Sequence, residues 1–483
     1  MKKILALALA CIMILSACSF AAAEEPVTLK ILFRSSDVSG YTDTINLINE
    51  KLLAAGINAQ LEPYAEPSSN YPDFVNNMLQ TWDESEIYDI IYVQGTAINP
   101  SYLGSLDLLV DMTDLLANST NAKAIYDADS ILQAQFASCP YLLWPSQVNK
   151  CLQFRTDALK ACPSYEDFLA NPDQAAYSKL FDELKAQGYE GVLTTQGIDY
   201  LFDTGIDSGF GITATWLKNE DGTYTYSRVS ENFLNELKWW REMYVAGNLH
   251  ANFATDNWES MENALYTGKV AGIAMKGGAY TVYYDTNTVT NYGEEATLTI
   301  LPPMKSAEGA QQYKITSNRF DRGYVISTTC KNPELAFAVL DFMLGEEGRK
   351  MDLFGFEGID HTVNADGTYD LKVNSSETSF QRIFDSDVFG SIDVQAVTTG
   401  VKYWPDPSFE SSKMMSEYGV ADNDFVVPDD LATAWTACET LWKEFATQYI
   451  LGEKTDADWQ TYVDTWNSYG GNKVAEYAAT VIK

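Results

Sequence analysis

The residue types that most often carry chemistry are scarce in this chain. Only two histidines, His250 and His361, occur among 483 residues, which leaves little room for a histidine-rich zinc site or a serine–histidine triad. No stretch matches G-x-S-x-G, H-E-x-x-H, G-x-x-x-x-G-K-[ST] or G-x-G-x-x-G. The usual hydrolase, metalloprotease and nucleotide-binding motifs are therefore missing, and we expect neither a metal ion nor a cofactor.

Aromatic side chains, in contrast, are abundant: the chain has 11 Trp, 29 Tyr and 22 Phe residues. A sugar presents an apolar face and a rim of hydroxyl groups, so a site for it combines flat rings with amide, carboxylate and guanidinium groups. Most of the rings must belong to the core, and Trp240, Trp459 and Trp466 lie on apolar helical stripes. The rings outside such stripes are candidates for a carbohydrate site.

Several aromatic and polar residues outside these stripes are candidate ligand contacts, although packing is the alternative role of each. They are Trp144 with its neighbour Gln147, Tyr200 in the loop 197–200, Trp258 after Asp256-Asn257, and Trp404 in the proline-bounded loop 401–407. Arg319 and Arg322 are further candidates, because a guanidinium group binds hydroxyl groups in a fixed geometry. The two arginines flank Asp321, so an ion pair with that carboxylate or a bridge between domains is the competing explanation.

The elements that must position these residues begin with an alternation of strand and helix patterns. Apolar residues alternate over 27–33 and 57–61, recur at helical spacing over 45–52 and 74–82, and form a nearly continuous run over 87–93. A β-α-β-α-β order predicts an open parallel sheet with helices on both faces, which binds ligands beyond the carboxyl ends of its strands. The loops 34–41 and 94–102 should lie at that edge, so Tyr41 and Gln94 are candidate contacts on position alone.

Turn and capping signals mark the later elements. We predict helices over 175–184, from Ser230 to the closing Gly247, from Asn332-Pro333 to 344 and from about 456 to Gly470-Gly471. The Asp-Gly pairs at 221–222 and 366–367 each predict a hairpin turn, and neither stretch has the spaced carboxylates of a calcium loop. No proline- or glycine-rich linker divides the chain, so we expect domains joined by several crossing strands.

The N-terminus has the pattern of a secretory signal peptide over residues 1–17. Lys2 and Lys3 precede an apolar run over 4–15 that is too short to span a bilayer. The sequence LSAC at 15–18 looks like a bacterial lipobox, so we expect 18–26 to be a lipidated tether with its acyl chains on Cys18. This predicts a protein anchored to the outer face of the bacterial cell membrane. The alternative is ordinary signal cleavage within 21–23.

Charge and cysteine content narrow the possible partners. With 67 acidic and 32 basic residues, the formal charge is -35, which repels nucleic acids and anionic lipid headgroups and predicts a neutral or cationic partner. The cysteines beyond Cys18 are dispersed singly, so we expect buried thiols, with one bridge among the first three as the alternative. They are Cys139, Cys151, Cys162, Cys330 and Cys438.

Several segments, in order along the chain, resemble the family 1 extracellular solute-binding proteins of ATP-driven importers, in their sugar-type lipoprotein branch. They include YTGKVAGIAM (266–275), LPPMK (301–305), NPELA (332–336) and GFEG (355–358). The resemblance makes Tyr280 a candidate contact, because the family usually offers an aromatic ring there. It also singles out Glu357 of the GFEG turn, whose alternative role is to stabilise the loop. The branch more often has tyrosine where this chain has His361.

The resemblance implies an α/β fold of the periplasmic-binding-protein type, with two lobes of doubly wound sheets joined by crossing strands and closing about a hinge. By analogy, the chain crosses between the lobes near 144–153, near 297–303 and after the helix that ends at 344. Lobe I would comprise 27–145 plus 299–346, and lobe II would comprise 146–298 plus 347–483.

The resemblance also implies a non-enzymatic, monomeric lipoprotein that captures a neutral carbohydrate, in particular an oligosaccharide. Its partner would be the transmembrane subunits of an ABC permease, and nucleic acid would play no part. Two alternatives stay open: a carrier of peptides or small cationic solutes with the same fold, favoured by the negative charge, and a secreted glycoside hydrolase. The second stays open because sequence does not show whether two of the 67 carboxylates face each other.

Overall fold

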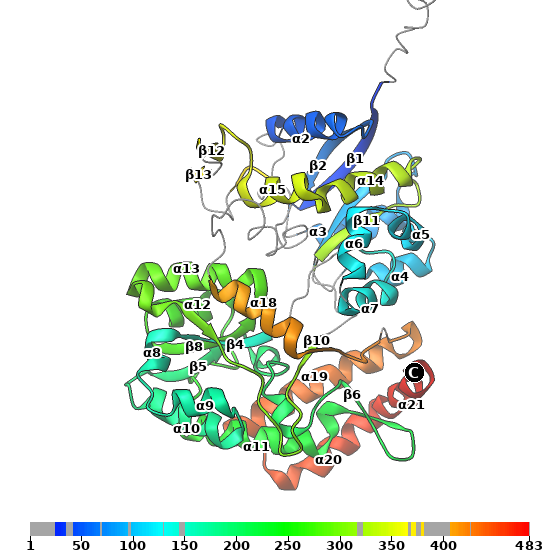
Figure 1. Ribbon diagram of the computed structural model, residues 1–483. Helices are drawn as coiled ribbons and strands as arrows, with labels where there is room; N and C mark the ends of the chain where they lie inside the picture. The colour runs from blue at the N-terminus through cyan, green and yellow to red at the C-terminus, as the bar shows by residue number, and fades with distance from the viewer. Residues whose placement is uncertain are drawn as a thin grey trace, which may run out of the picture.

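The computed structural model describes residues 25–34, 42–67, 70–94, 98–128, 130–143, 150–315, 322–365, 369–372, 378–380, 406–425 and 427–482. Their elements form two lobes, which lie at the top and the bottom of Figure 1, with the first strand in the upper lobe and the last helix in the lower. The predicted signal peptide with Cys18 and five candidate contacts lie outside the described residues. These are Tyr41, Trp144, Gln147, Arg319 and Trp404.

Lobe I, the upper lobe, is built on a four-stranded sheet in the order β11-β3-β1-β2. Strands β1 (Val27–Arg34), β2 (Ala59–Glu66) and β3 (Ile90–Gln94) run parallel and are connected by helices α2 (Thr42–Ala54) and α3 (Tyr71–Thr81). Strand β11 (Arg322–Ile326) comes from far along the chain and pairs antiparallel with β3. The predicted β-α-β-α-β order is confirmed, and β11 adds an edge strand to it.

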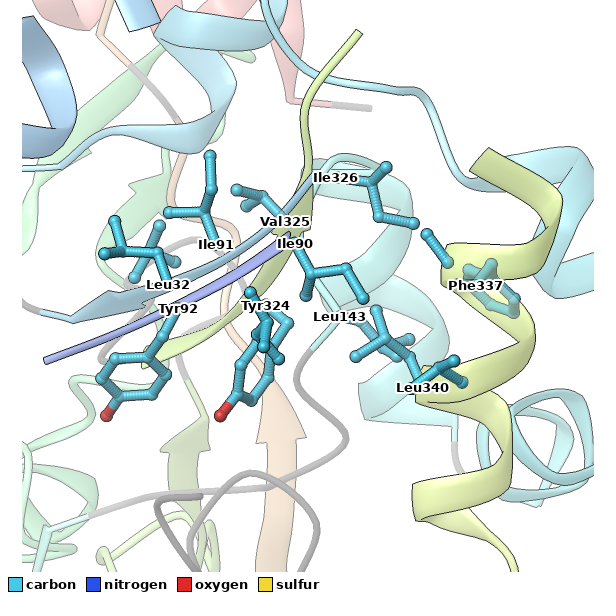
Figure 2. Packing of buried hydrophobic residues seen from close by; sticks show 14 of the residues in the cluster. Leu32, Ile90, Ile91, Tyr92, Leu143, Tyr324, Val325, Ile326, Phe337 and Leu340 are labelled. Atoms are coloured by element: carbon cyan, nitrogen blue, oxygen red, sulfur yellow. The ribbon is translucent and has the colours of Figure 1, made fainter. Parts of the chain in front are cut away.

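The core of lobe I lies where this sheet meets helix α14 (Pro333–Leu344). Figure 2 shows Phe337 and Leu340 of α14 beside side chains of β3 and β11. Leu143 packs in the same cluster and forms an isolated bridge with Tyr324. Full burial of one such side chain contributes about 1.5–3 kcal/mol. This packing ties β11 and α14 to the N-terminal sheet and so fixes the position of Arg322 at the start of β11.

Lobe II is built on a second four-stranded sheet, in the order β5-β8-β4-β9. Strand β4 (Lys150–Arg155) runs antiparallel to both β8 (Val270–Lys276) and β9 (Leu298–Ile300), and β5 (Gly191–Thr195) runs parallel to β8. Helices α10 (Gln174–Lys185), α12 (Trp258–Tyr266) and α13 (Thr281–Tyr292) pack against this sheet. Strands β4 and β8 are therefore buried along nearly their whole length. Strand β4 begins with Lys150 and β8 ends with Lys276, and both lysines are partly exposed.

The C-terminal helices complete lobe II by packing around α11 (Glu231–Val245). They are α19 (Asp429–Leu451), α20 (Asp456–Ser468) and α21 (Gly471–Val481). Trp240, Trp459 and Trp466 expose 0%, 6% and 2% of their surface, which confirms their predicted place in the core. The Ser230 hydroxyl accepts a hydrogen bond from the Phe233 amide at 3.2 Å and caps α11, as the sequence predicts.

The remaining elements are short and mostly surround the two sheets. In lobe I they are α4 (Pro100–Ser105), α5 (Thr113–Ala117), α6 (Asn121–Asp127), α7 (Ser130–Ser138), α15 (Glu346–Phe354), β12 (His361–Val363) and β13 (Tyr369–Leu371). In lobe II they are α8 (Thr156–Lys160), α9 (Tyr165–Ala170), β6 (Trp216–Lys218), β7 (Tyr224–Tyr226), β10 (Tyr313–Ile315), α18 (Asp406–Tyr418), β14 (Gly419–Ala421) and the 3-10 helices η2 (Ile198–Leu201), η3 (Asp207–Phe210), η4 (Ser227–Val229), η5 (Gly278–Tyr280) and η6 (Glu294–Ala296). Strands β6 and β7 form the predicted hairpin around Asp-Gly. Asn332 precedes Pro333 at the start of α14, but its side chain makes no capping bond.

The packing divides the chain at different positions from the predicted lobe boundaries. The predicted lobe I segment 299–346 begins too early, because β9 pairs with β4 and Leu301 and Met304 lie in the core of lobe II. It also ends too early, because Met351, Phe356 and Phe380 lie in the core of lobe I. The chain therefore passes between the lobes within 143–150, 315–322 and 380–406.

The five cysteines in the described part of the chain are all buried free thiols, which confirms that interpretation over a disulfide bridge. Within the same part, no helix is both long and apolar enough to cross a membrane. The described residues also contain no group of three or more histidine, cysteine, aspartate or glutamate side chains that is arranged to hold a metal ion.

Candidate ligand-binding site

Polar and aromatic residues from both lobes meet where three strands begin or end. Arg322 is the first residue of β11 in lobe I, and Lys150 and Lys276 are the first residue of β4 and the last residue of β8 in lobe II. Gln94, at the end of β3, pairs with Arg322 in the lobe I sheet. The candidate contacts Gln94 and Arg322 are thus brought side by side by strand register.

Tyr280 is the residue of lobe II that reaches Arg322. A guanidinium Nη2 of Arg322 donates a hydrogen bond to the Tyr280 hydroxyl, and the guanidinium carbon lies 5.2 Å from the centroid of the Tyr280 ring. Between described residues of the two lobes, this is the only hydrogen bond. Because Tyr280 and Arg322 expose only 5% and 8% of their surface, solvent weakens their interaction little.

Other side chains of lobe II surround the same ring. The Lys276 ammonium lies 5.0 Å from the Tyr280 ring centroid, and the indole of Trp258 meets the ring edge to face with the centroids 6.4 Å apart. Tyr200 and Trp258 both pack against the cluster of buried residues that contains Tyr280. Since Tyr280 is itself buried, its ring offers no open face in this conformation, whereas Tyr200 and Trp258 are partly exposed.

Two glycines place Tyr280 at this junction. A Cβ atom on Gly277 would lie 2.2 Å from the Ser411 Oγ and 2.8 Å from the Cys151 Sγ, so only glycine fits between β4 and α18. Gly278 has φ of 64°, which glycine adopts without strain, and its amide donates a hydrogen bond to the Ser411 Oγ at 2.7 Å. The chain can therefore turn beneath α18 and begin α13 directly after Tyr280.

Lys150 lies beside the second tyrosine of the site. Its ammonium is 5.1 Å from the centroid of the Tyr200 ring and donates a hydrogen bond to the Asp199 carbonyl at 2.6 Å. The same ammonium lies 3.9 Å from the Asp203 carboxylate. Asp203 has φ of 60°, a left-handed conformation that is uncommon for residues other than glycine. This backbone bend turns the Asp203 carboxylate toward cations in the interior of lobe II.

A buried charge cluster lies behind Lys150. The Asp203 carboxylate is 2.7 Å from an Arg228 guanidinium nitrogen and 2.5 Å from the Lys314 ammonium. Burial alone would raise the pKa of Asp203, but Arg228, Lys314 and Lys150 outweigh it and hold that pKa well below its usual value. On the far side of Arg228, burial raises the pKa of Glu236 to about 8. The cluster therefore contains a carboxylate that is charged at neutral pH and another that is mostly protonated.

The structure thus brings five of the predicted contacts, Gln94, Tyr200, Trp258, Tyr280 and Arg322, to one junction; for Gln94 this concerns the backbone alone. It does not bring Glu357 there. Glu357 is exposed in the turn before β12, where its backbone forms an isolated β-bridge with His361.

Three residues of the junction are absent from the sequence prediction: Lys150, Lys276 and Asp203. The two lysines are at the ends of otherwise apolar strands, in a chain with few basic residues, and that is the signal that marks them.

A hollow lies on the surface of lobe II, apart from this junction. It has a volume of about 550 Å³ and is lined by residues of α19 and by Tyr469. Its lining consists of three threonines, one alanine, one leucine, one glutamate and Tyr469, and includes no cation. It therefore lacks the combination of rings and charged hydrogen-bond donors that the junction of the lobes provides.

Comparison with solved structures finds the same fold in several proteins. Among them are an extracellular solute-binding protein from Bifidobacterium longum subsp. infantis (TM-score 0.66, 13% identity, 95% of this chain and 98% of that chain) and the N-glycan transport solute binding protein NgtS from Streptococcus pneumoniae (TM-score 0.66, 13% identity, 95% and 100%). The alginate-binding protein AlgQ2 without calcium ion is another (TM-score 0.64, 14% identity, 95% and 98%). These likenesses confirm the predicted two-lobed α/β fold.

The sequence itself carries a family signature. No curated protein matches the sequence of this chain. The family profile described as bacterial extracellular solute-binding protein matches residues 86–350, which is more than half of the chain. The matched region includes β3, β11, the whole lobe II sheet and α14, and hence the strands that meet at the candidate site. The chain therefore belongs to the bacterial extracellular solute-binding protein family.

Proposed function

We propose that this protein is the substrate-binding component of an ATP-driven importer and that it captures a carbohydrate between its lobes. The observation that carries the proposal is the meeting of Arg322 from lobe I with Tyr280 from lobe II, beside Tyr200 and Trp258. Partly exposed rings provide stacking surfaces for the apolar face of a sugar, and a guanidinium group donates to its hydroxyl oxygens. The importer role rests on the family.

Structures with the same fold support a carbohydrate as the ligand class. They include complexes with fructo-nystose, kestose, Man1GlcNAc and acarbose. The residues at the lobe junction of this chain have the chemistry that such ligands need. The importer's permease would receive the ligand from the closed protein, and the lobes would open and close about the segments within 143–150, 315–322 and 380–406.

The proposal includes an address, an anchor and the absence of catalysis. The lipobox-like sequence at 15–18 supports a diacylglyceryl group on Cys18 that holds the protein on the outer face of the cell membrane. The protein would act as a monomer and bind without turnover. A peptide or small cationic solute is the less favoured ligand, because Lys150, Lys276 and Arg322 at the junction would repel a positive charge.

A thermal unfolding screen tests this function. The purified protein is heated with mono- and oligosaccharides, short peptides and polyamines, and a ligand at a hundredfold its Kd stabilises by about 2.7 kcal/mol. We expect a rise in Tm with saccharides and no release of reducing ends. A rise with peptides or polyamines alone would contradict the carbohydrate assignment, and release of reducing ends would contradict a pure carrier. Metabolic labelling with a fatty acid in wild type and Cys18→Ala checks the anchor.

A further inference from the structure

Two lysines face each other at the edge of the lobe II sheet where Tyr280 meets lobe I. Lys150 on β4 and Lys276 on β8 are register partners in the antiparallel pair. Opposite residues in such a pair have their Cβ atoms about 4.5–5.5 Å apart, and like charges there destabilise the sheet. A pair that costs stability at a candidate binding site points to a role in binding rather than in folding.

A third cation reaches the same place from the other lobe. The Lys150 ammonium, the Lys276 ammonium and the Arg322 guanidinium carbon lie 5.1, 5.0 and 5.2 Å from the ring centroids of Tyr200 or Tyr280. Lys150, Lys276 and Arg322 also make other interactions. What distinguishes the site is that three positive charges from three strands converge on two rings. In a chain with 67 acidic and 32 basic residues, such a grouping of three cations stands out.

The described carboxylates near Lys150 are also paired with other cations. Asp203 lies 3.9 Å from Lys150, and it is closer to Arg228 and Lys314, at 2.7 and 2.5 Å. The Asp199 carboxylate lies 3.6 Å from the Lys443 ammonium, while the Asp199 backbone carbonyl accepts a hydrogen bond from Lys150. The Lys150 ammonium thus lies next to the partly exposed ring of Tyr200, beside carboxylates that also contact other cations.

We propose that the ligand is an acidic saccharide whose anionic group is bound by Lys150, Lys276 and Arg322. This inference rests on the carbohydrate-binding function proposed above. Tyr280 holds Arg322 in place through its hydroxyl, and Tyr200 and Trp258 stack on the sugar rings. The proposed ligand thus differs from the neutral carbohydrate that we expected from the sequence and its net charge. The net charge acts through water and salt, which screen it beyond about 10 Å at 0.1 M ionic strength, whereas the three cations act at contact distance.

The test compares saccharides that differ only in charge. Binding of the purified protein is measured by calorimetry with trigalacturonate and its fully methyl-esterified form, and with a sulfated chondroitin disaccharide and its unsulfated, carboxyl-reduced form. We expect one acidic form to bind at least about tenfold more tightly than its neutral partner, a difference of about 1.4 kcal/mol. A preference in the trigalacturonate pair shows that a carboxylate alone is sufficient for recognition.

Variants at the two ends of β8 show whether the local cations are responsible. In Lys276→Met the preference for the acidic form should fall to about threefold or less, because one of three contact charges is lost. Lys269→Met is the matched control, since Lys269 directly precedes β8, pairs with Glu190 at 3.9 Å and is 46% exposed; its preference should equal that of the wild type. Thermal unfolding of both variants checks that each is folded.

Each outcome bears on the proposal. Equal binding of the charged and neutral forms, or tighter binding of the neutral form, would overturn the acidic ligand while the carbohydrate-binding function stands. An undiminished preference in folded Lys276→Met would also overturn it, because the discrimination would then arise elsewhere. If no saccharide binds, charged or neutral, both the acidic ligand and the carbohydrate-binding function fail.

Discussion

Removal of the Tyr280 hydroxyl should loosen the closed arrangement of the two lobes without disturbing either lobe. In Tyr280→Phe the ring stays, and with it the Arg322 guanidinium 5.2 Å and the Lys276 ammonium 5.0 Å from its centroid. What disappears is the hydroxyl that accepts a hydrogen bond from Arg322, the only hydrogen bond between described residues of the two lobes. The substitution therefore acts on the junction of the lobes.

The magnitude follows from the charge and burial of the pair. A hydrogen bond to a charged group contributes about 1.5–3 kcal/mol, and Tyr280 and Arg322, at 5% and 8% exposed, are poorly placed for water to replace it. If only the closed arrangement binds ligand tightly, the affinity falls with the closed population. At about 1.4 kcal/mol per factor of ten, we expect Kd to rise about 10- to 100-fold.

Calorimetry with the ligand found in the unfolding screen measures Kd, and small-angle X-ray scattering of the ligand-free protein measures the radius of gyration, which should increase. Tyr292→Phe is the matched control. The Arg155 guanidinium lies 3.9 Å from the Tyr292 ring centroid, and the Tyr292 hydroxyl donates a hydrogen bond to the Tyr266 carbonyl at 2.9 Å. All three residues lie within lobe II. Equal Kd and equal radius in the two variants would refute this account of the junction.

Three further substitutions test the surroundings of the site. Asp203→Asn should destabilise the protein by about 3–5 kcal/mol, because it leaves buried cations without their shared carboxylate; urea unfolding measures this, with the exposed Asp221→Asn as control. Since burial raises the pKa of Glu236 from 4.5 to about 8, the unfolded state binds fewer protons between these values and stability falls as the pH rises. Glu236→Gln should thus have a higher Tm than wild type at a pH of about 9 and an equal Tm at a pH of about 4. Gly277→Ala should weaken ligand binding, because its Cβ would lie 2.2 Å from a side-chain oxygen. Gly222→Ala is the control, since its Cβ would meet nothing within 4 Å. It should cost only about 1 kcal/mol of stability, because alanine is strained at a φ of 84°, and leave Kd unchanged.

Local patterns made the N-terminal part of lobe I and single helices of lobe II predictable. The order of strands and helices from β1 to β3 follows from apolar spacing within short windows, and Ser230 marks the start of α11 through a cap that involves residues three positions apart. The lobe boundaries do not follow from such windows. Strand β9 is only three residues long, and its place in the lobe II sheet is decided by pairing with β4, which is distant in sequence. The predicted boundary at 299 was wrong for that reason.

The site shows the same limit at the level of single residues. Tyr280 and Arg322 were predicted separately, from resemblance and from the hydrogen-bonding chemistry of a guanidinium group, and only the packing of two lobes makes them partners. Lys150 and Lys276 were missed because a lysine at the end of a strand usually points into solvent. Their opposition across β4 and β8 depends on register, which no local pattern in either strand specifies.

The way in which the lobes are joined suits a reversible receptor. In the described part of the chain, each cluster of buried apolar residues belongs to one lobe, so no shared core holds the lobes together. The junction depends instead on polar contacts such as Arg322 with Tyr280, which are each worth about 1.5–3 kcal/mol. A ligand with a Kd near 1 μM supplies about 8 kcal/mol. Closure is therefore within reach of the ligand's binding energy, and the same weakness lets the lobes separate once the ligand is withdrawn.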